Sequence, residues 1–428
     1  MAENKTGVKK RLPLQGVTVL DFSRVLSGPY CTMVLADLGA RVIKIERVGA
    51  GDDTRAWGPF VDDESAYFMC FNRGKESIAL DFKSPRDREL LERLLDKSDV
   101  LVENFRPGVM DRLGYGAEQL ARTHPHIVYA SISGFGHTGP FKDLPGYDMV
   151  VQAMGGVMSL TGWPDQPPAR VGTSFGDLGA ALFAVIGIVA GLYKRSKDAQ
   201  GTHVDIAMLD CQAALMETAF ARLDVEGKVP TRTGDAHPSL APFESFAAQD
   251  GRIVIAAGND QLFLLMADAM GVPELALDPL FLTNDLRVQN RPALTEAIER
   301  ITRTAPIGIW LDKLNEAGVP CAPINTIDKV LEHPQLLARN MFIHVRGESE
   351  RKVKTAGNPV KMSTSPDEDM TVVRKAPAVD RHREAILAEL MASSGAYASQ
   401  ADAESDDDGP ERVTTGARHE RSSITPQI

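Results

Sequence analysis

The stretch VTVLDFSRVLSGPYCTMVLADLGARVIKIE, residues 17–46, decides the expected fold. Its two apolar ends, residues 17–22 and 41–46, are typical of buried strands. Between them Pro29 suits the first turn of a helix, and Gly39 suits the position after its end. A strand, a helix and a second strand in so short a span predict a βαβ unit of a parallel sheet.

The same alternation continues along the chain. Further strands are predicted over residues 77–82, 100–105 and 126–135, and a helix should begin at Ser84–Pro85. Helices are also expected over residues 148–160 and 204–220. The pattern predicts an α/β fold with a Rossmann-like, doubly wound parallel sheet, which binds ligands at the carboxyl ends of its strands.

One acid stands where a polar segment becomes a long apolar helix. Asp177 lies between Gly176 and Gly179, just ahead of the apolar run 178–193. A carboxylate in the first turn of a helix faces the positive end of the macrodipole, so we expect Asp177 to stay ionised and to act as a nucleophile or base. A helix cap is the ordinary alternative. The run is slightly short for a membrane span and contains glycines, which favours a buried core helix.

Composition excludes several classes of function. The 428 residues carry a net charge of −11, which does not suit binding to nucleic acid or acidic lipid. The four cysteines are far apart and the histidines form no HxxxH or HExxH pattern on a helix, so neither a disulfide framework nor a zinc site is expected. The N-terminus has no apolar leader, which predicts a soluble, cytoplasmic protein.

A change of character after residue 225 predicts a second domain. The segment 226–242 is polar and contains proline and glycine, as in a linker. Residues 243–258 predict a hairpin that turns at Asp250–Gly251. Helices over 261–270, 291–302 and 309–317 complete a small α+β domain. The expected division is 1–225 for the N-terminal part of the large domain, 226–325 for the linker and small domain, 326–393 for a return to the large domain, and 394–428 for a disordered tail.

The segment GFGHTG, residues 134–139, matches the glycine pattern of a dinucleotide-binding turn. Such a turn should open directly into a helix, whereas Pro140 and then Pro145–Gly146 follow here. No strand that ends in an acid lies at the expected distance downstream. We interpret the segment as a glycine-rich loop near a site, with a nicotinamide dehydrogenase as an alternative that NADH binding would test.

Several motifs together resemble one known family over about residues 15–390. They are LDFSRVLSGP, LGARVIKIER, FNRGKESIALD, VENFRPG, YASISGFGHTGP, GYDMVVQAMGG and SFGDLGAAL, in that order. This order is similar to that in the class III CoA-transferases, which are also named for carnitine and bile-acid CoA-transferases and include formyl-CoA:oxalate CoA-transferase. The resemblance implies a large CoA-binding domain, a small domain and an interlocked homodimer.

The resemblance also implies a site. Asp177 would be the nucleophile that carries a covalent aspartyl-CoA thioester, with acyl-CoA as a substrate and no permanently bound cofactor. It assigns contacts with CoA to Val25, Ser27, Arg47, Leu80, Asn104, Phe105, Arg112 and Tyr147. It assigns a substrate-facing turn to Leu26 and a substrate-facing loop to Gly258, Asn259, Asp260 and Gln261, and the second subunit would contribute this loop to the site.

The chain departs from the oxalate-specific branch of that family. Leu26 stands where that branch has glutamine, Pro145 where it has lysine, and residues 258–261 (GNDQ) where it has four glycines. The segments RTGDAHPSLAPFESF, AAGNDQLF and GVPCAPINT are more similar to family members that use other short dicarboxylates, including succinyl-CoA:glutarate and acetyl-CoA:oxalate CoA-transferases. This resemblance implies transfer from formyl-, acetyl- or succinyl-CoA to a short dicarboxylate, with oxalate first and succinate or glutarate next. The alternatives are an acyl-CoA racemase, which would need histidine at Tyr147 for proton transfer, and a non-catalytic CoA-binding protein.

Overall fold

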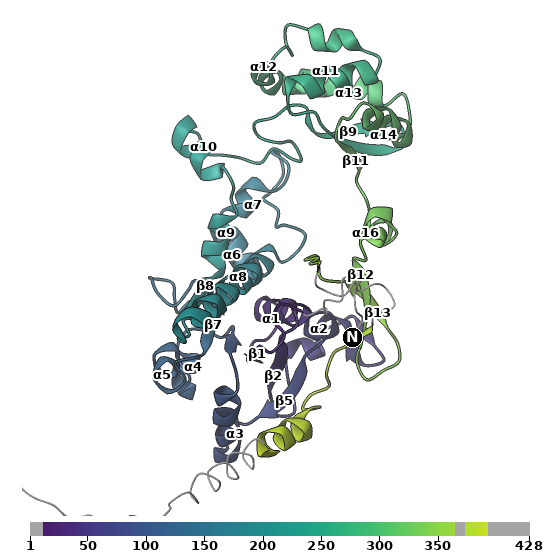
Figure 1. Cartoon of the computed structure of the whole chain (residues 1–428). Helices are drawn as coiled ribbons and strands as arrows, with labels where there is room; N and C mark the ends of the chain where they lie inside the picture. Colours follow the sequence, from purple (N-terminus) through teal and green to yellow (C-terminus); the bar gives the residue numbers. More distant parts are fainter. Residues whose placement is uncertain (1–11, 364–372, 393–428) are drawn as a thin grey trace, which may run out of the picture. The chain divides into compact units, whose positions relative to one another are not determined.

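A computed structural model describes residues 12–363 and 373–392 (Figure 1). Contacts along the chain divide it into a first unit that ends at Arg381 and a second that begins at His382. Within the second unit, residues 383–392 form a helix. The predicted tail, 394–428, lies outside the described residues.

The first unit is built on a parallel sheet with the strand order β5-β2-β1-β6-β7-β8. The strands are β1 (Thr18–Asp21), β2 (Arg41–Arg47), β5 (Glu76–Leu80), β6 (Val100–Glu103), β7 (Val128–Ser133) and β8 (His203–Ala207). All five neighbouring pairs are parallel. From β1 the chain builds outward to β2 and β5 on one side and then to β6, β7 and β8 on the other. The order therefore reverses between β1 and β6, which creates a crevice at the carboxyl ends of these two strands.

Helices connect the strands of this sheet, as the βαβ pattern predicts. They are α1 (Ser27–Asp37), α2 (Ala66–Asn72), α3 (Pro85–Asp96), α4 (Val109–Leu113) and α5 (Ala117–Thr123). The predicted start of α3 is confirmed, because Pro85 occupies its first turn and the Ser84 hydroxyl accepts the Asp87 N–H at 3.4 Å. A short helix η1 (Asp53–Ala56) and a two-stranded sheet of β3 (Phe60–Val61) and β4 (Glu64–Ser65) lie between β2 and α2.

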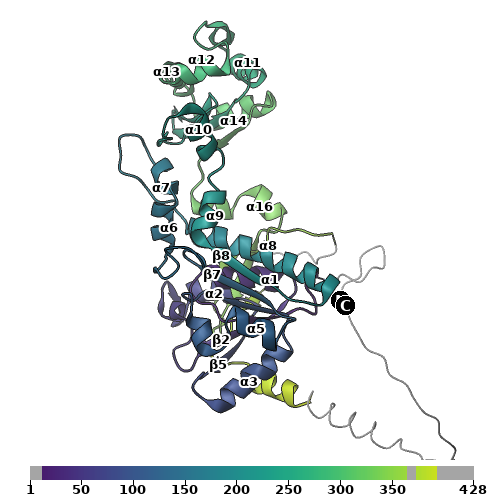
Figure 2. The ribbon, with the colours of Figure 1, turned by 90° about the vertical axis from the view of Figure 1, so that its left-hand side faces the viewer.

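Helix α8 (Phe175–Asp198) is the long apolar helix and packs on α1, α9, β7 and β8 (Figure 2). One face is buried in the main core through Ala180, Ala181, Ala184 and Ile188. The opposite face exposes Leu182, Ile186, Val189 and Tyr193. The prediction of a buried core helix therefore holds for one face. In length and in its mean hydropathy of 2.0, α8 would also suit a membrane span.

Two predicted helices are wrong in part. The segment 204–220 begins instead with strand β8, because its alternating Val204 and Ile206 extend the sheet beside β7. Helices α9 (Met208–Ala214) and α10 (Ala219–Glu226) follow it. The segment 148–160 is split into α6 (Asp148–Met154) and α7 (Val157–Leu160), because Gly156 adopts a left-handed φ of 85°.

Residues 243–323 form an antiparallel sheet in the order β11-β10-β9. Its elements and the helices around it are β9 (Phe243–Ala248), β10 (Gly251–Ala256), α11 (Asp260–Ala269), η2 (Pro273–Leu277), α12 (Asn284–Gln289), α13 (Arg291–Thr302), α14 (Ile307–Glu316) and β11 (Cys321–Pro323). The hairpin and the three helices match the predictions within two residues. A separate apolar core runs from Ala241 to Val319, inside the range 226–325, so the small domain has its own core.

The chain then returns toward its N-terminal part. After α15 (Ile327–Leu331) and α16 (Pro334–Ala338), strands β12 (Phe342–Arg346), β13 (Val353–Ala356) and β14 (Val373–Lys375) form a third sheet. Ile343 and Val345 of β12 share a core with Phe68 and Met69 of α2. The segment predicted to rejoin the large domain thus packs against residues near the start of the chain.

Candidate active site

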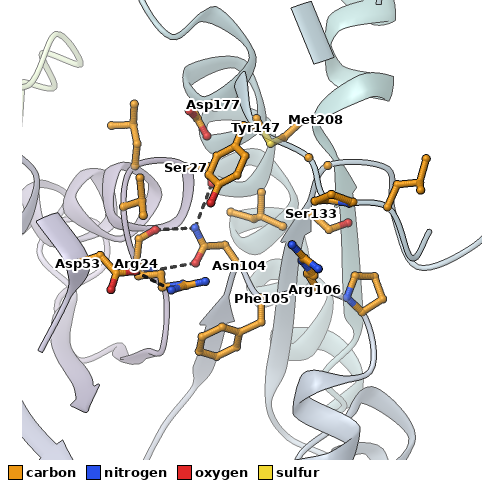
Figure 3. A pocket seen from close by; sticks show the side chains of 18 of the residues that line it. Arg24, Ser27, Asp53, Asn104, Phe105, Arg106, Ser133, Tyr147, Asp177 and Met208 are labelled. Carbon is orange, nitrogen blue, oxygen red and sulfur yellow. Dashed lines mark hydrogen bonds and ion pairs between the residues drawn. The ribbon is translucent and has the colours of Figure 1, made fainter. Parts of the chain in front are cut away.

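A cavity of about 620 Å³ opens where the strand order reverses (Figure 3). Its walls come from the loops after β1, β6 and β7, the segment around η1, the segment before α6, and the starts of α8 and α9. The residues that line it are Arg24, Val25, Leu26, Ser27, Asp53, Trp57, Asn104, Phe105, Arg106, Pro107, Ile132, Ser133, Gly134, Leu144, Pro145, Gly146, Tyr147, Asp177 and Met208. We call this cavity the crevice.

Asn104 joins the two loops that form the crevice. Its side-chain amide donates to the carbonyl of Arg24 at 2.6 Å and accepts the N–H of Arg24 at 2.8 Å. The same Nδ2 lies 3.3 Å from the hydroxyl of Ser27 (Figure 3). The loop after β6 is therefore fastened to the loop after β1 by three hydrogen bonds from one side chain.

The turn at Val25 has a strained backbone that buried side chains hold in place. Val25 has a φ of 69°, which a β-branched residue rarely adopts. Its N–H donates to Asp52 Oδ1 at 3.3 Å. Asp52 forms a buried ion pair with Lys44 at 3.0 Å, and Lys44 also donates to the carbonyl of Ser23 at 2.7 Å. A buried charged pair thus holds a backbone conformation that the local sequence disfavours.

A second buried pair fixes the start of this loop. Asp21, the last residue of β1, accepts the N–H of Ser23 at 2.9 Å and pairs with Lys75 at 2.9 Å. Burial opposes ionisation of Asp21, but Lys75 and Lys44 outweigh it and hold the pKa of this carboxyl below its ordinary value. Both partners of the pair are fully buried.

Asp177 occupies the third position of α8 and faces the crevice. Burial and the Asp148 carboxylate raise its pKa to about 7, although a hydrogen bond with Ser27 acts in the opposite direction. The expectation that Asp177 stays fully ionised is therefore wrong near neutral pH. The N-terminus of α8 does not stabilise the negative charge of Asp177 alone. The N–H of Gly176 donates to the Asp148 carboxylate at 2.8 Å.

Asp148 is a residue that sequence reasoning missed. Besides the N–H of Gly176, it accepts the amide of Gln152 at 2.8 Å, and the Arg170 guanidinium lies 3.7 Å away. It is the first residue of α6, beside Tyr147 at the N-cap. The carboxylate therefore caps α8 from another helix and leaves Asp177 free to face the crevice.

Tyr67 is a second missed residue. Burial, followed by the charges of Asp177, Asp52 and Asp148, raises its pKa to about 12, so its phenol remains protonated. Its ring contacts Trp57 edge-on at 5.8 Å between centroids, and Trp57 lines the crevice. No spacing in the sequence connects α2 with α8, so this relationship needed the structure.

Seven of the predicted residues line the crevice together. They are Val25, Leu26, Ser27, Asn104, Phe105, Tyr147 and Asp177. The other predicted residues of this set are not in the lining. Leu80 is buried in the core, and Arg112 is exposed on α4. Arg47 is at the edge of the crevice, because it pairs at 2.6 Å with Asp53, which lines it.

The predicted loop 258–261 does not line the crevice of its own chain, and its expected contribution to the site of a second subunit stays a prediction. Asn259 caps α11 by accepting the N–H of Leu262 at 2.8 Å, and Asp260 pairs at 2.7 Å with the fully buried Arg287. The segment is therefore the fixed start of a helix.

Two arginines were not singled out from the sequence but lie in the crevice. Arg24 pairs with Asp53 at 2.6 Å. Arg106 lines the crevice and, among the described residues, its guanidinium forms no ion pair or hydrogen bond. A guanidinium suits phosphate oxygens. The position of Arg106 directly after a predicted strand end was the available signal.

The GFGHTG segment does not begin a helix. The N–H of Gly136 donates to Ser133 Oγ at 2.9 Å and that of His137 to Asp205 Oδ2 at 3.0 Å, and the next helix starts at Asp148. This geometry differs from a dinucleotide-binding turn. In the described residues, no group of three His, Cys, Asp or Glu side chains is arranged for a metal ion.

These features define a class of protein: an α/β enzyme with a carboxylate of raised pKa beside a crevice at the topological switch point. The model of CoA-transferase family III matches residues 14–383, and the chain belongs to this family. Acetyl-CoA:oxalate CoA-transferase of Acetobacter aceti is 48% identical over 359 residues, which cover 84% of this chain and 91% of that protein.

Two further comparisons agree. Succinyl-CoA:glutarate CoA-transferase of Mus musculus is 39% identical and covers 89% of this chain and 86% of its own length. The crystal structure of a CAIB/BAIF family protein from Brucella suis superposes with a TM-score of 0.77 at 41% identity, over 88% of this chain and 99% of that one. The protein is an enzyme of the CoA-transferase class.

Proposed function

We propose that the enzyme moves CoA from an acyl-CoA donor to a short dicarboxylate through a covalent intermediate on Asp177. The observation that carries the proposal is the position of this carboxylate in the first turn of α8, where it faces the crevice with a pKa of about 7. A carboxylate with a pKa near the working pH is both partly ionised and more nucleophilic than an ordinary aspartate.

The reaction would proceed in four balanced steps. An Asp177 oxygen attacks the acyl carbon of the donor, and the CoA thiolate leaves, which gives a mixed anhydride. The thiolate then attacks Cγ of Asp177 and expels the donor acid, which leaves an aspartyl-CoA thioester. The acceptor carboxylate attacks the same Cγ and releases the thiolate. The thiolate finally attacks the acceptor's acyl carbon, which restores the Asp177 carboxylate.

Positioning and exclusion of water are the protein's main tasks in this scheme, because water would hydrolyse either intermediate. Ser27, which is hydrogen bonded to Asp177, would orient the attacking carboxylate. Arg106, Arg24 and the loop held by Asn104 would bind the acyl-CoA.

For the acceptor, we propose oxalate first and succinate or glutarate next. Support comes from relatives named for oxalate and glutarate and from a further relative named succinyl-CoA:mesaconate CoA-transferase, of Haloarcula hispanica. The test loads the enzyme with acetyl-CoA and measures new CoA thioesters of these acids by mass spectrometry. Carnitine as the best acceptor would contradict the proposal.

We further propose that the enzyme is a homodimer in the cytoplasm, interlocked as the family resemblance implies. The exposed apolar residues Leu182, Ile186, Val189 and Tyr193 lie on one face of α8 and suit burial against a second copy. The free cysteines suit a reducing compartment. Light scattering would test the mass, and a monomeric mass would refute the proposal.

The covalent step is tested by trapping. Acetyl-CoA followed by hydroxylamine or borohydride should modify Asp177, and Asp177→Ala should abolish both the modification and turnover while acyl-CoA still binds. Modification of another residue would refute the assignment. Deuterium exchange at the α-carbon without CoA exchange would instead support the racemase alternative.

A further inference from the structure

Glu103 is a buried carboxyl group beneath the crevice that the proposed reaction does not use. It is the last residue of β6 and is 2% exposed. Its Oε2 accepts the N–H of Phe105 at 2.6 Å, and its Oε1 lies 2.9 Å from the Tyr129 hydroxyl on β7. Phe105 and its neighbour Asn104 line the crevice, so Glu103 shapes the turn that carries both.

The same arrangement occurs on the other side of the crevice. Asp21 ends β1 and accepts the N–H of Ser23, two residues on, just as Glu103 ends β6 and accepts the N–H of Phe105. Asn104 then links the two loops. The two loops that Asn104 links, after β1 and after β6, therefore each begin with a strand-end carboxyl group that binds the backbone of its own loop.

The two carboxyl groups differ in charge. Asp21 has two lysines beside it, whereas Glu103 forms no ion pair among the described residues. The titratable groups around Glu103 include the Tyr129 phenol and the acids Asp111 of α4 and Asp205 of β8. They also include His203 of β8, whose ring stacks on that of Tyr129 at 4.9 Å between centroids. Burial, together with these acids, raises the pKa of Glu103 to about 8, against hydrogen bonds from Phe105 and Tyr129 that act in the opposite direction.

We propose that Glu103 is a positioning residue for acyl-CoA binding and that it holds the Asn104–Phe105 wall in its binding geometry in the protonated, neutral form. Loss of the proton would place an unpaired charge in the core, and the loop after β6 would move to admit water to it. The affinity for acyl-CoA should then fall as Glu103 ionises. This inference rests on the proposed role of the crevice as the acyl-CoA site.

Binding experiments separate this effect from chemistry. The dissociation constant of acetyl-CoA is measured by calorimetry from about pH 7 to 9 in Asp177→Ala, which cannot react and whose position 177 no longer titrates. The thioester has no free thiol, and its phosphates are already titrated near pH 6, so the ligand keeps its charge over this range. If the ionised form does not bind, the dissociation constant should rise up to about tenfold by pH 9.

The matched variant is Asp177→Ala with Glu103→Gln. The glutamine oxygen can accept the Phe105 N–H, and its NH2 group can donate to the Tyr129 oxygen as the O–H of a neutral Glu103 would, but glutamine has no proton to lose. Its dissociation constant should match that of Asp177→Ala at about pH 7 and change less than about twofold by pH 9. Burial lowers the pKa of Lys75 to about 8, so this group titrates in the same range. Lys75 is present in both proteins, so its effect on the dissociation constant cancels when they are compared. Glu76→Gln, which removes an acid that pairs with Arg41 outside the crevice, should retain the rise.

A steady-state measurement complements the binding data. In the otherwise native enzyme, Glu103→Gln should remove the alkaline rise in KM for acetyl-CoA while kcat keeps the native profile, and Glu103→Leu should raise KM at every pH. An equal alkaline rise in native enzyme and Glu103→Gln, or none in either, would overturn the inference. Failure of acetyl-CoA to bind at about pH 7 would instead refute the assignment of the crevice.

Discussion

The Asp148 carboxylate accepts the backbone N–H of Gly176 at 2.8 Å, one residue before Asp177. The two acids come from different helices, α6 and α8, and share the N-terminal turn of α8. Asp148 satisfies the helix and Asp177 faces the crevice. The charge of Asp148 also raises the pKa of Asp177, so the cap of the helix and the reactivity of the candidate nucleophile are coupled.

Asp148→Asn should lower the pKa of Asp177. The amide oxygen can still accept the Gly176 N–H, but the negative charge is gone. The acid limb of the kcat/KM profile, expected near pH 7 in the native enzyme, should move to lower pH. Rates from about pH 5 to 8 would measure the shift. Gln152→Glu, which adds a charge near Asp148, should move the limb in the opposite direction, and an unmoved limb in both variants would argue against the coupling.

Asp177→Asn should stabilise the folded enzyme at neutral and higher pH. The pKa of Asp177 is about 3.8 in the unfolded chain and about 7 in the folded one. Between these pH values the folded state binds more protons than the unfolded state, so the free energy of unfolding falls as the pH rises. Asparagine does not ionise, so the free energy of unfolding of the variant does not fall for this reason. Its gain should be on the order of 1–3 kcal/mol at about pH 8 and should shrink toward about pH 4. Urea unfolding at both pH values would measure it, and a gain that does not depend on pH would point to another cause.

Lys75→Met should strongly destabilise the large domain. The substitution removes a fully buried partner of Asp21 and leaves that carboxylate with Lys44 alone nearby. A loss of about 3–5 kcal/mol in the free energy of unfolding is expected. The double variant Asp21→Asn with Lys75→Met should recover part of this loss, since no buried charge is then left unpaired.

An exposed pair provides the control for this prediction. Lys194 and Asp198 are 2.6 Å apart on the surface of α8, and Lys194→Met should cost less than about 1 kcal/mol. Similar losses for Lys75→Met and Lys194→Met in urea unfolding would show that burial does not set the strength of the pair.

Gly146→Ala should disturb the wall that carries Tyr147. A Cβ at Gly146 would lie against the backbone of Gly134, and a Cβ at Gly134 would lie 2.6 Å from the Cα of Gly146. Relief of this clash requires movement of backbone, which should cost about 1–3 kcal/mol and raise KM for acyl-CoA. Gly308→Ala is the control, because nothing lies within 4 Å of its added carbon. Native KM in Gly146→Ala would mean that the wall tolerates the shift.

The local sequence was sufficient for most of the fold. Apolar runs predicted five strands of the parallel sheet, Ser84–Pro85 predicted the start of α3, and Asp250–Gly251 predicted the hairpin. These signals work because strand burial, helix capping and turn conformation depend on neighbouring residues. Strand β8 was missed because its residues run into α9 without a turn residue, and only pairing with β7 reveals it.

The sequence by itself placed Asp177 at the start of a helix and brought Val25, Ser27 and Asn104 into one expected site. Tertiary structure decided the charge state of that site. Asp148 reaches Gly176 across 28 residues, Lys75 reaches Asp21 across 54, and Tyr129 reaches Glu103 across 26. The pKa of a carboxyl group depends on its burial and on the charges that surround it in space. Such neighbours come together when the chain folds, so no local pattern could have predicted that Asp177 has a raised pKa or that Asp21 and Glu103, at equivalent strand ends, differ in charge.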